Sequence, residues 1–185
     1  MMVKYNTIEM DPPWPYRDKN IGWRGEEGAA LKYPLMSLEE LKALPISNVS
    51  NKDSVLFLWV TIPFLPQGPK VLECYGYSYK TSIIWRKIMS HGMGWWFRGQ
   101  CEICLVGIKG KVKAFHAQKS NFIQTKVRKH SQKPEEFYEL IEPFCGIPRL
   151  ELFASTKRDG WDSVGFDCNN QDVRDFLQTG ILRNE

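Results

Sequence analysis

A chain of 185 residues, 43% of them hydrophobic and 13% aromatic, can bury the core of one α/β domain and is too apolar to be disordered. Its longest apolar run, residues 55–65, is interrupted by Thr61 and Pro63 and is too short to cross a bilayer. We find no signal-peptide pattern at the N-terminus and no disulfide-framework spacing among five cysteines, so we expect a cytoplasmic protein without membrane contact.

The net charge of +4 hides an uneven distribution. Twelve lysines and arginines accompany a single acid, Glu102, between Lys80 and Lys133, whereas acids outnumber bases by seven to four from Glu151 to Glu185. A basic central third interleaved with aromatic residues is typical of proteins that bind a polyanion, and it predicts a nucleic-acid partner. A solvated basic face is the alternative.

The first predicted strand covers residues 3–10. It is ended by the run Asp11-Pro12-Pro13-Trp14-Pro15-Tyr16. Proline has no N–H to donate, so this backbone is rigid and presents carbonyl oxygens beyond the carboxyl end of a strand, where open α/β sheets bind ligands. A carboxylate, bare carbonyls and aromatic rings suit a planar group that carries an NH₂, such as the exocyclic amine of adenine. A simple turn is the alternative.

Predicted helices and strands then alternate along the chain. A capping box at Ser37 and Glu40 opens a short helix, and Pro134 is expected at the first position of a later one. Strands are predicted at residues 54–61, 81–85, 102–109, 149–154 and 161–166. Helices are predicted near residues 37–44, 69–75, 134–144 and 172–177. Residues 17–32 and 90–100 are expected to be loops at the site, and 111–129 a loop with one edge strand. This order predicts a doubly wound, mainly parallel sheet.

Cys101 and Cys104 form a C-x-x-C pair, which in other contexts binds zinc. Zinc requires a second pair of ligands, and Cys145 and Cys168 do not have the spacing of one. Residues three apart in the predicted strand also point to opposite faces. We therefore interpret both cysteines as structural and expect no metal.

Asp11-Pro12-Pro13-Trp14 resembles the signature of the DPPW-type adenine-N6 methyltransferases, the family that contains the catalytic subunit of the eukaryotic messenger-RNA enzyme. The resemblance extends from about residue 7 to residue 167. The other stretches that agree in order and spacing are Tyr33-Pro34-Leu35-Met36, Leu56–Val60, Glu102–Gly107, Ser131-Gln132-Lys133-Pro134, and Leu150–Ala154 followed by Gly160-Trp161-Asp162.

The resemblance implies one Rossmann-like methyltransferase domain, residues 1–185, which is circularly permuted so that the catalytic strand comes first. Residues 90–133 are expected to form a basic, loop-rich segment within it that faces the substrate. No G-x-G-x-x-G loop follows the strand at 150–154, so the cofactor, S-adenosylmethionine, is implied by the resemblance alone. Relatives hold the cofactor adenine with a segment upstream of DPPW, and we expect this chain to lack it.

The resemblance also implies roles for individual residues. Catalysis is expected at Asp11, Pro12, Pro13 and Trp14. The cofactor is expected at Lys133, which would contact its methionine carboxylate, and at Ser155, Lys157, Arg158, Asp159 and Asp167. The substrate is expected at Tyr16, Tyr33, Lys87, Trp95, Trp96, Glu102 and Ser131. Phe166 stands where relatives carry an amide. A salt bridge from Glu102 to Arg86, Lys87 or Arg98 is the alternative to its substrate role.

These patterns together predict an S-adenosylmethionine-dependent methyltransferase that modifies N6 of adenine in nucleic acid. DNA is the expected substrate because the chain is compact, and RNA is the second candidate. A catalytically silent subunit that only binds nucleic acid is the alternative from a different functional class. The sequence leaves a homodimer and a paralogous partner subunit both open.

Overall fold

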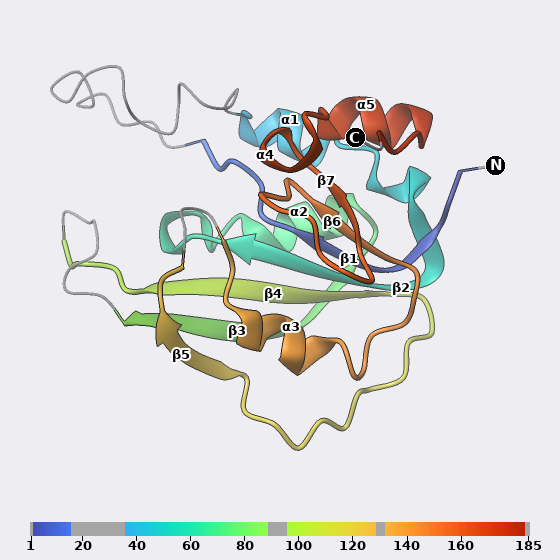
Figure 1. Cartoon of the computed structure of the whole chain (residues 1–185). Coiled ribbons are helices and arrows are strands. Elements are labelled where there is room, and N and C mark those ends of the chain that lie inside the picture. The colour runs from blue at the N-terminus through green and yellow to red at the C-terminus, as the bar shows by residue number, and fades with distance from the viewer. Residues whose placement is uncertain (1, 16–35, 89–95, 129–131, 184–185) are drawn as a thin grey trace, which may run out of the picture.

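The structure is a computed structural model that describes residues 2–15, 36–88, 96–128 and 132–183. These residues form a mixed α/β fold around a seven-stranded sheet (Figure 1). The strands are β1 (Tyr5–Met10), β2 (Ser50–Val60), β3 (Ser78–Ile88), β4 (Cys101–Lys109), β5 (Phe122–Lys126), β6 (Arg149–Leu152) and β7 (Asp162–Val164). The helices are α1 (Leu38–Lys42), α2 (Gly68–Cys74), α3 (Glu135–Ile141), α4 (Phe166–Asn169) and α5 (Val173–Thr179), with short 3₁₀ turns η3 (Ile46–Asn48) and η4 (Ile62–Phe64).

The strand order across the sheet is β5-β3-β4-β2-β1-β6-β7. β1 pairs in parallel with β2 and β6, and parallel pairs also join β6 to β7 and β3 to β5. β4 runs antiparallel to both of its neighbours, β2 and β3. The sheet is therefore mostly parallel, as predicted, and β5 is the predicted edge strand.

The two faces of the sheet carry separate hydrophobic cores. β2 serves both because its residues alternate between the faces and are nearly all apolar. Leu56 and Leu58 pack into the core shared with α1, α2 and α5, whereas Phe57 and Trp59 pack against Phe137 of α3. Figure 1 shows α1 and α5 on one side of the sheet and α3 on the other. Full burial of each such side chain contributes about 1.5–3 kcal/mol to folding.

The predicted start of the first helix is confirmed in detail. The Ser37 hydroxyl accepts a hydrogen bond from the Glu40 N–H at 3.1 Å, and the Glu40 carboxylate accepts one from the Ser37 N–H at 2.8 Å. This capping box satisfies two of the N–H groups that a helix leaves unpaired at its start. The start of α3 differs by one residue from the prediction, because Pro134 has an extended ψ of 146° and is the N-cap.

The last strand is shorter than predicted. β7 ends at Val164, and the chain continues into α4 instead of extending as a strand to Phe166. The change of direction occurs at Gly165, where an added Cβ would lie 2.2 Å from the Ala154 carbonyl oxygen. Only glycine tolerates this approach of two backbone segments. The side chain of Asn169 then accepts a hydrogen bond from the Gly165 N–H at 3.1 Å, which closes the turn.

The sheet topology identifies the edge at which a ligand site is expected. From β1 the chain moves to β2 on one side, whereas β6 lies on the other side of β1 and leads on to β7. Chain connections thus diverge between β1 and β6, and ligands of open α/β sheets bind at such a point beyond the carboxyl ends of the strands. Asp11 follows β1 there, and Phe153 follows β6.

Cys101 and Cys104 both lie in β4, as the strand prediction required. The Cys104 thiol is buried, and burial raises its pKa well above the ordinary value. In the described ranges no helix is both long and apolar enough to cross a membrane.

Candidate active site

Four charged side chains form a continuous chain of contacts at the carboxyl edge of the sheet. The Lys133 ammonium donates to Asp11 Oδ2 at 2.5 Å and to Glu102 Oε2 at 3.0 Å. The other oxygen of Glu102 accepts from Lys87. The Lys133 side chain is only 7% exposed, compared with 30% for Asp11. Lys133 therefore holds Asp11 and Glu102 together from inside the protein.

Strand register explains why residues so far apart in the sequence meet. Asp11 directly follows β1. Glu102 lies at the start of β4, and because β4 is antiparallel to β2 it comes to the same edge as Asp11. Glu102 is the register partner of Trp85, and Lys87, two residues along β3, points to the same face as Trp85. Lys133 enters from the segment before α3 and lies 5.0 Å above the Trp59 ring.

The charges of this cluster support one another. Burial disfavours the Lys133 ammonium, but the carboxylates of Asp11 and Glu102 outweigh burial and raise the pKa of Lys133. Burial also opposes ionisation of Glu102, yet the ammonium groups of Lys133 and Lys87 lower its pKa below the ordinary value. Burial raises the pKa of Asp11, against the opposing charge of Lys133. Glu102 and Lys133 are therefore both charged at neutral pH.

Both interpretations of Glu102 are met at once. It pairs with Lys87, as the salt-bridge alternative held, and through Lys133 it also reaches Asp11. The Lys133 contact was not predicted. It was missed because Lys133 is 31 residues from Glu102 and no local pattern relates the two.

The aromatic residue of the Asp-Pro-Pro-Trp run faces the protein interior. Trp14 is 3% exposed, its indole N–H donates to the Trp59 carbonyl at 2.9 Å, and its ring stacks on Phe64 at 5.4 Å. In this position Trp14 anchors the turn that presents Asp11, and it offers no free face to a base. Pro12 is buried next to it.

A cavity of about 500 Å³ opens beside the charged cluster. Asp11 and Lys133 lie on its wall. The loop after β6 contributes the predicted cofactor residues Ser155, Lys157, Arg158 and Asp159. The structure thus brings five of the six predicted cofactor residues to one cavity. The sixth, Asp167, lies in the first turn of α4 and does not line it.

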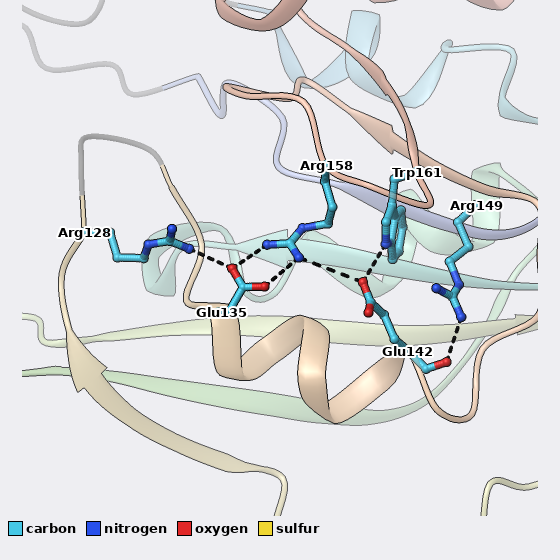
Figure 2. Close-up of polar contacts among 6 residues, drawn as sticks. All are labelled: Arg128, Glu135, Glu142, Arg149, Arg158 and Trp161. Carbon is cyan, nitrogen blue, oxygen red and sulfur yellow. Dashed lines mark hydrogen bonds and ion pairs between the residues drawn. The ribbon is translucent and has the colours of Figure 1, made fainter.

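The loop after β6 is fastened to α3 by ion pairs (Figure 2). Arg158 donates to both oxygens of Glu135, at 2.6 Å each, and Arg128 donates to one of them at 3.0 Å. The Trp161 indole N–H donates to Glu142, at the end of α3, at 2.8 Å. A two-pronged arginine–carboxylate contact fixes orientation as well as distance. Arg158 therefore forms a fixed part of the cavity wall, whereas its neighbour Lys157 is exposed.

The remaining predicted substrate residues divide into two groups. Trp96 is described and is 93% exposed, ahead of the start of β4. Tyr16, Tyr33, Trp95 and Ser131 lie outside the described residues.

The basic third of the chain is split between opposite edges of the sheet. Lys87 and Lys133 are at the site, but Lys109 ends β4 next to Ser54, at the amino end of the described core of β2. Lys111 and Lys113 follow directly. The prediction that the whole basic third adjoins the active-site loops is therefore wrong for these three lysines, because β4 carries the chain to the far edge.

Two acids that the sequence reasoning overlooked lie deepest in the cavity. Glu9 is 1% exposed and Glu151 is 9% exposed, and they are register partners on β1 and β6. A signal for Glu9 was present: it lies two residues before Asp11, so it points to the same face of β1. An acid at an interior strand position is unusual and marks a site worth examining.

Comparisons with known proteins agree with this geometry. The model of the MT-A70 family matches residues 5–167. The chain is 30% identical to the type II methyltransferase M.MunI of a Mycoplasma species, over 98% of this chain and 85% of that protein. It is 32% identical to human N(6)-adenosine-methyltransferase catalytic subunit METTL3, over 89% of this chain but 28% of that protein. An MT-A70-like N(6)-adenosine-methyltransferase of Arabidopsis thaliana is 31% identical, with 24% of its length covered.

Proposed function

Because this chain belongs to the MT-A70 family of adenine N6-methyltransferases, we propose that it transfers a methyl group from S-adenosylmethionine to N6 of adenine in DNA. The observation that carries the proposal is the contact between Asp11 and Lys133 beside the cavity. It joins the two family motifs, Asp-Pro-Pro-Trp and Ser-x-Lys-Pro, into one site. The family's methyltransferase fold, permuted so that the catalytic strand comes first, is part of the same proposal and is supported by the position of β1 in the sheet.

The cavity fits the proposed cofactor. Its volume of about 500 Å³ lies within the range of about 300–1,000 Å³ that is usual for small-molecule sites. Its wall carries both carboxylates and cationic side chains, which suits the zwitterionic amino-acid end of S-adenosylmethionine. When bound, S-adenosylmethionine supplies an electrophilic methyl group. We propose that Ser155, Lys157, Arg158 and Asp159 hold it, together with Lys133.

Asp11 is proposed to accept a hydrogen bond from the N6 amine of the acceptor adenine. The lone pair of this amine is delocalised into the ring, and an acceptor for its hydrogens favours the pyramidal, nucleophilic form. A fixed carboxylate also stabilises the positive charge that develops on nitrogen, provided that it does not have to reorient during the reaction. Lys133 and Glu102 meet this requirement because they hold the Asp11 side chain in place.

DNA is proposed as the substrate because the relative matched over most of its own length is named a type II methyltransferase, a designation of DNA-modifying enzymes. The N(6)-adenosine-methyltransferases, of which the chain covers about a quarter, favour RNA as the second candidate. Lys87, Glu102 and exposed Trp96 are the described residues proposed to meet the acceptor strand.

Methylation of matched DNA and RNA pools with labelled S-adenosylmethionine, followed by nucleoside analysis, tests the proposal. We expect label in N6-methyldeoxyadenosine. Label in N6-methyladenosine alone would assign RNA instead. No transfer, together with no heat of S-adenosylmethionine binding in calorimetry, would favour the silent nucleic-acid-binding subunit.

A further inference from the structure

Glu9 is a buried carboxyl group for which the catalytic arrangement gives no role. It lines the deep part of the cavity, is 1% exposed, and its Oε1 atom lacks a hydrogen-bond partner of good geometry among the described residues. The Trp59 indole faces it and slightly favours its charged form, yet the Trp59 N–H is likewise without a well-formed bond there. An unsatisfied buried polar group is costly, so its presence in a cavity points to a ligand.

The neighbours of Glu9 are mostly acids or groups already engaged. Glu151 faces it from β6, and Asp11 lies two residues along β1. Tyr138 approaches from α3, hydrogen-bonds Glu151, and is affected by the charges of both glutamates. Cys104, on β4, is a neutral thiol nearby.

The nearest cations are committed elsewhere. Lys133 bonds Asp11 and Glu102, and Arg158 bonds Glu135. In the described part of the chain neither Glu9 nor Glu151 forms an ion pair within 4.0 Å. Two adjacent buried carboxyls without a counter-ion cannot both be ionised, because each charge opposes the other in a poorly solvated place. The ligand-free pair therefore holds a proton.

We propose that Glu9 and Glu151 form the binding site for a ligand ammonium group, the α-ammonium of S-adenosylmethionine, and that binding of this group expels the shared proton to solvent. The inference rests on the proposed function for the identity of the ligand and adds to it the site of the ammonium group. A cation placed between two carboxyls favours their ionised forms and satisfies the free Glu9 oxygen. The ligand carboxylate then faces the rim, where Lys157 is exposed.

The acid–base properties of the pair support the proposal. Burial, followed by the charges of Glu151 and Asp11, raises the pKa of Glu9 well above its ordinary value. Burial raises the pKa of Glu151 to about 7, against the opposing effects of Arg158 and the Tyr138 hydrogen bond. A group with a raised pKa is protonated at neutral pH when the cavity is free, and a bound cation lowers that pKa. Affinity should then rise with pH, by at most tenfold per pH unit for each proton released.

Isothermal titration calorimetry of S-adenosylmethionine at about pH 6.5, in buffers of different ionisation enthalpy, counts the released protons. This pH is below the pKa of about 7.7–8.0 of an ordinary α-amino group, so the ligand itself stays charged. We expect between about 0.5 and 1 proton released per ligand bound. The matched ligand control is 5′-methylthioadenosine, which keeps the adenosine and lacks the amino-acid group. It should release none.

Two variants sharpen the test. Glu9→Gln keeps the shape of the side chain but cannot bind or lose a proton, so we expect at least about tenfold weaker S-adenosylmethionine binding and loss of most of the proton release. Glu139→Gln, on the exposed part of α3, should behave like the wild type. Wild-type binding without buffer-dependent heat would overturn the proposal even if Glu9→Gln failed to fold, as would a Glu9→Gln variant with unchanged affinity and proton release. Absence of any S-adenosylmethionine binding to the wild type would instead refute the proposed function, and this inference with it.

Discussion

Replacing Lys133 by methionine removes the ammonium at the centre of the charged cluster while keeping most of the apolar stem. Loss of one partner from a buried ion pair costs about 3–5 kcal/mol because a charge is left uncompensated. Here the cost should be lower, because Glu102 retains Lys87 and the Asp11 side chain is 30% exposed. We expect the free energy of unfolding at pH 7 to fall by about 2–3 kcal/mol.

The loss should also depend on pH in a defined direction. Lys133 lowers the pKa of Glu102, so this contribution is present above the ordinary glutamate value of 4.5 and disappears as pH falls through the lower folded value. The difference between wild type and Lys133→Met should therefore be largest near neutral pH and shrink on acidification towards about pH 4.

Urea unfolding at several pH values measures both effects. The control is Lys42→Met, which removes the exposed i,i+3 pair with Glu39 and should cost about 0.3–0.5 kcal/mol. The reasoning is refuted if Lys133→Met costs less than about 1 kcal/mol at pH 7, or if its cost does not change with pH.

Three further predictions concern other parts of the molecule. Changing Arg98 and Lys126, both at the site edge, to Gln should reduce the salt dependence of oligonucleotide binding by about 0.9 per duplex phosphate contact, whereas Lys111→Gln at the far edge should not; equal slopes would contradict this placement. Trp96→Ala should weaken binding of single-stranded oligonucleotide by about 1–3 kcal/mol with an unchanged salt slope, measured by fluorescence anisotropy, and unchanged affinity would rule out stacking. Gly165→Ala should lower the free energy of unfolding by about 2–3 kcal/mol, because its Cβ would overlap the Ala154 carbonyl; a thermal midpoint equal to that of wild type would exclude this clash.

Local patterns were sufficient where the physics is local. The capping box at Ser37 and the apolar run of β2 were predicted because hydrogen bonding at a helix start and burial of a strand depend on neighbouring residues. The same holds for the edge strand β5, whose polar surroundings indicated exposure. α4 was missed because the turn at Gly165 depends on close approach to Ala154, which is distant in sequence.

The site was predictable as a set of residues but not as an arrangement. Motif resemblance identified Asp11, Lys133 and Glu102, yet the contact among them depends on strand order and register. The direction of β4 likewise decided that Lys109 lies at the far edge, which charge counting along the chain cannot reveal. The pairing of Glu9 with Glu151 became visible only when β1 and β6 were known to be neighbours.

The central claim is that Asp11 acts on the acceptor amine while the adjoining cavity binds the cofactor. Single-turnover methyl transfer and S-adenosylmethionine affinity, measured on the same preparations of wild type and Asp11→Asn, separate these two roles. We predict a loss of about 10²–10³ in the rate of transfer, with cofactor affinity within a few-fold of wild type. Retention of more than a tenth of the wild-type rate, or a loss of cofactor binding as large as the loss of rate, would contradict the account.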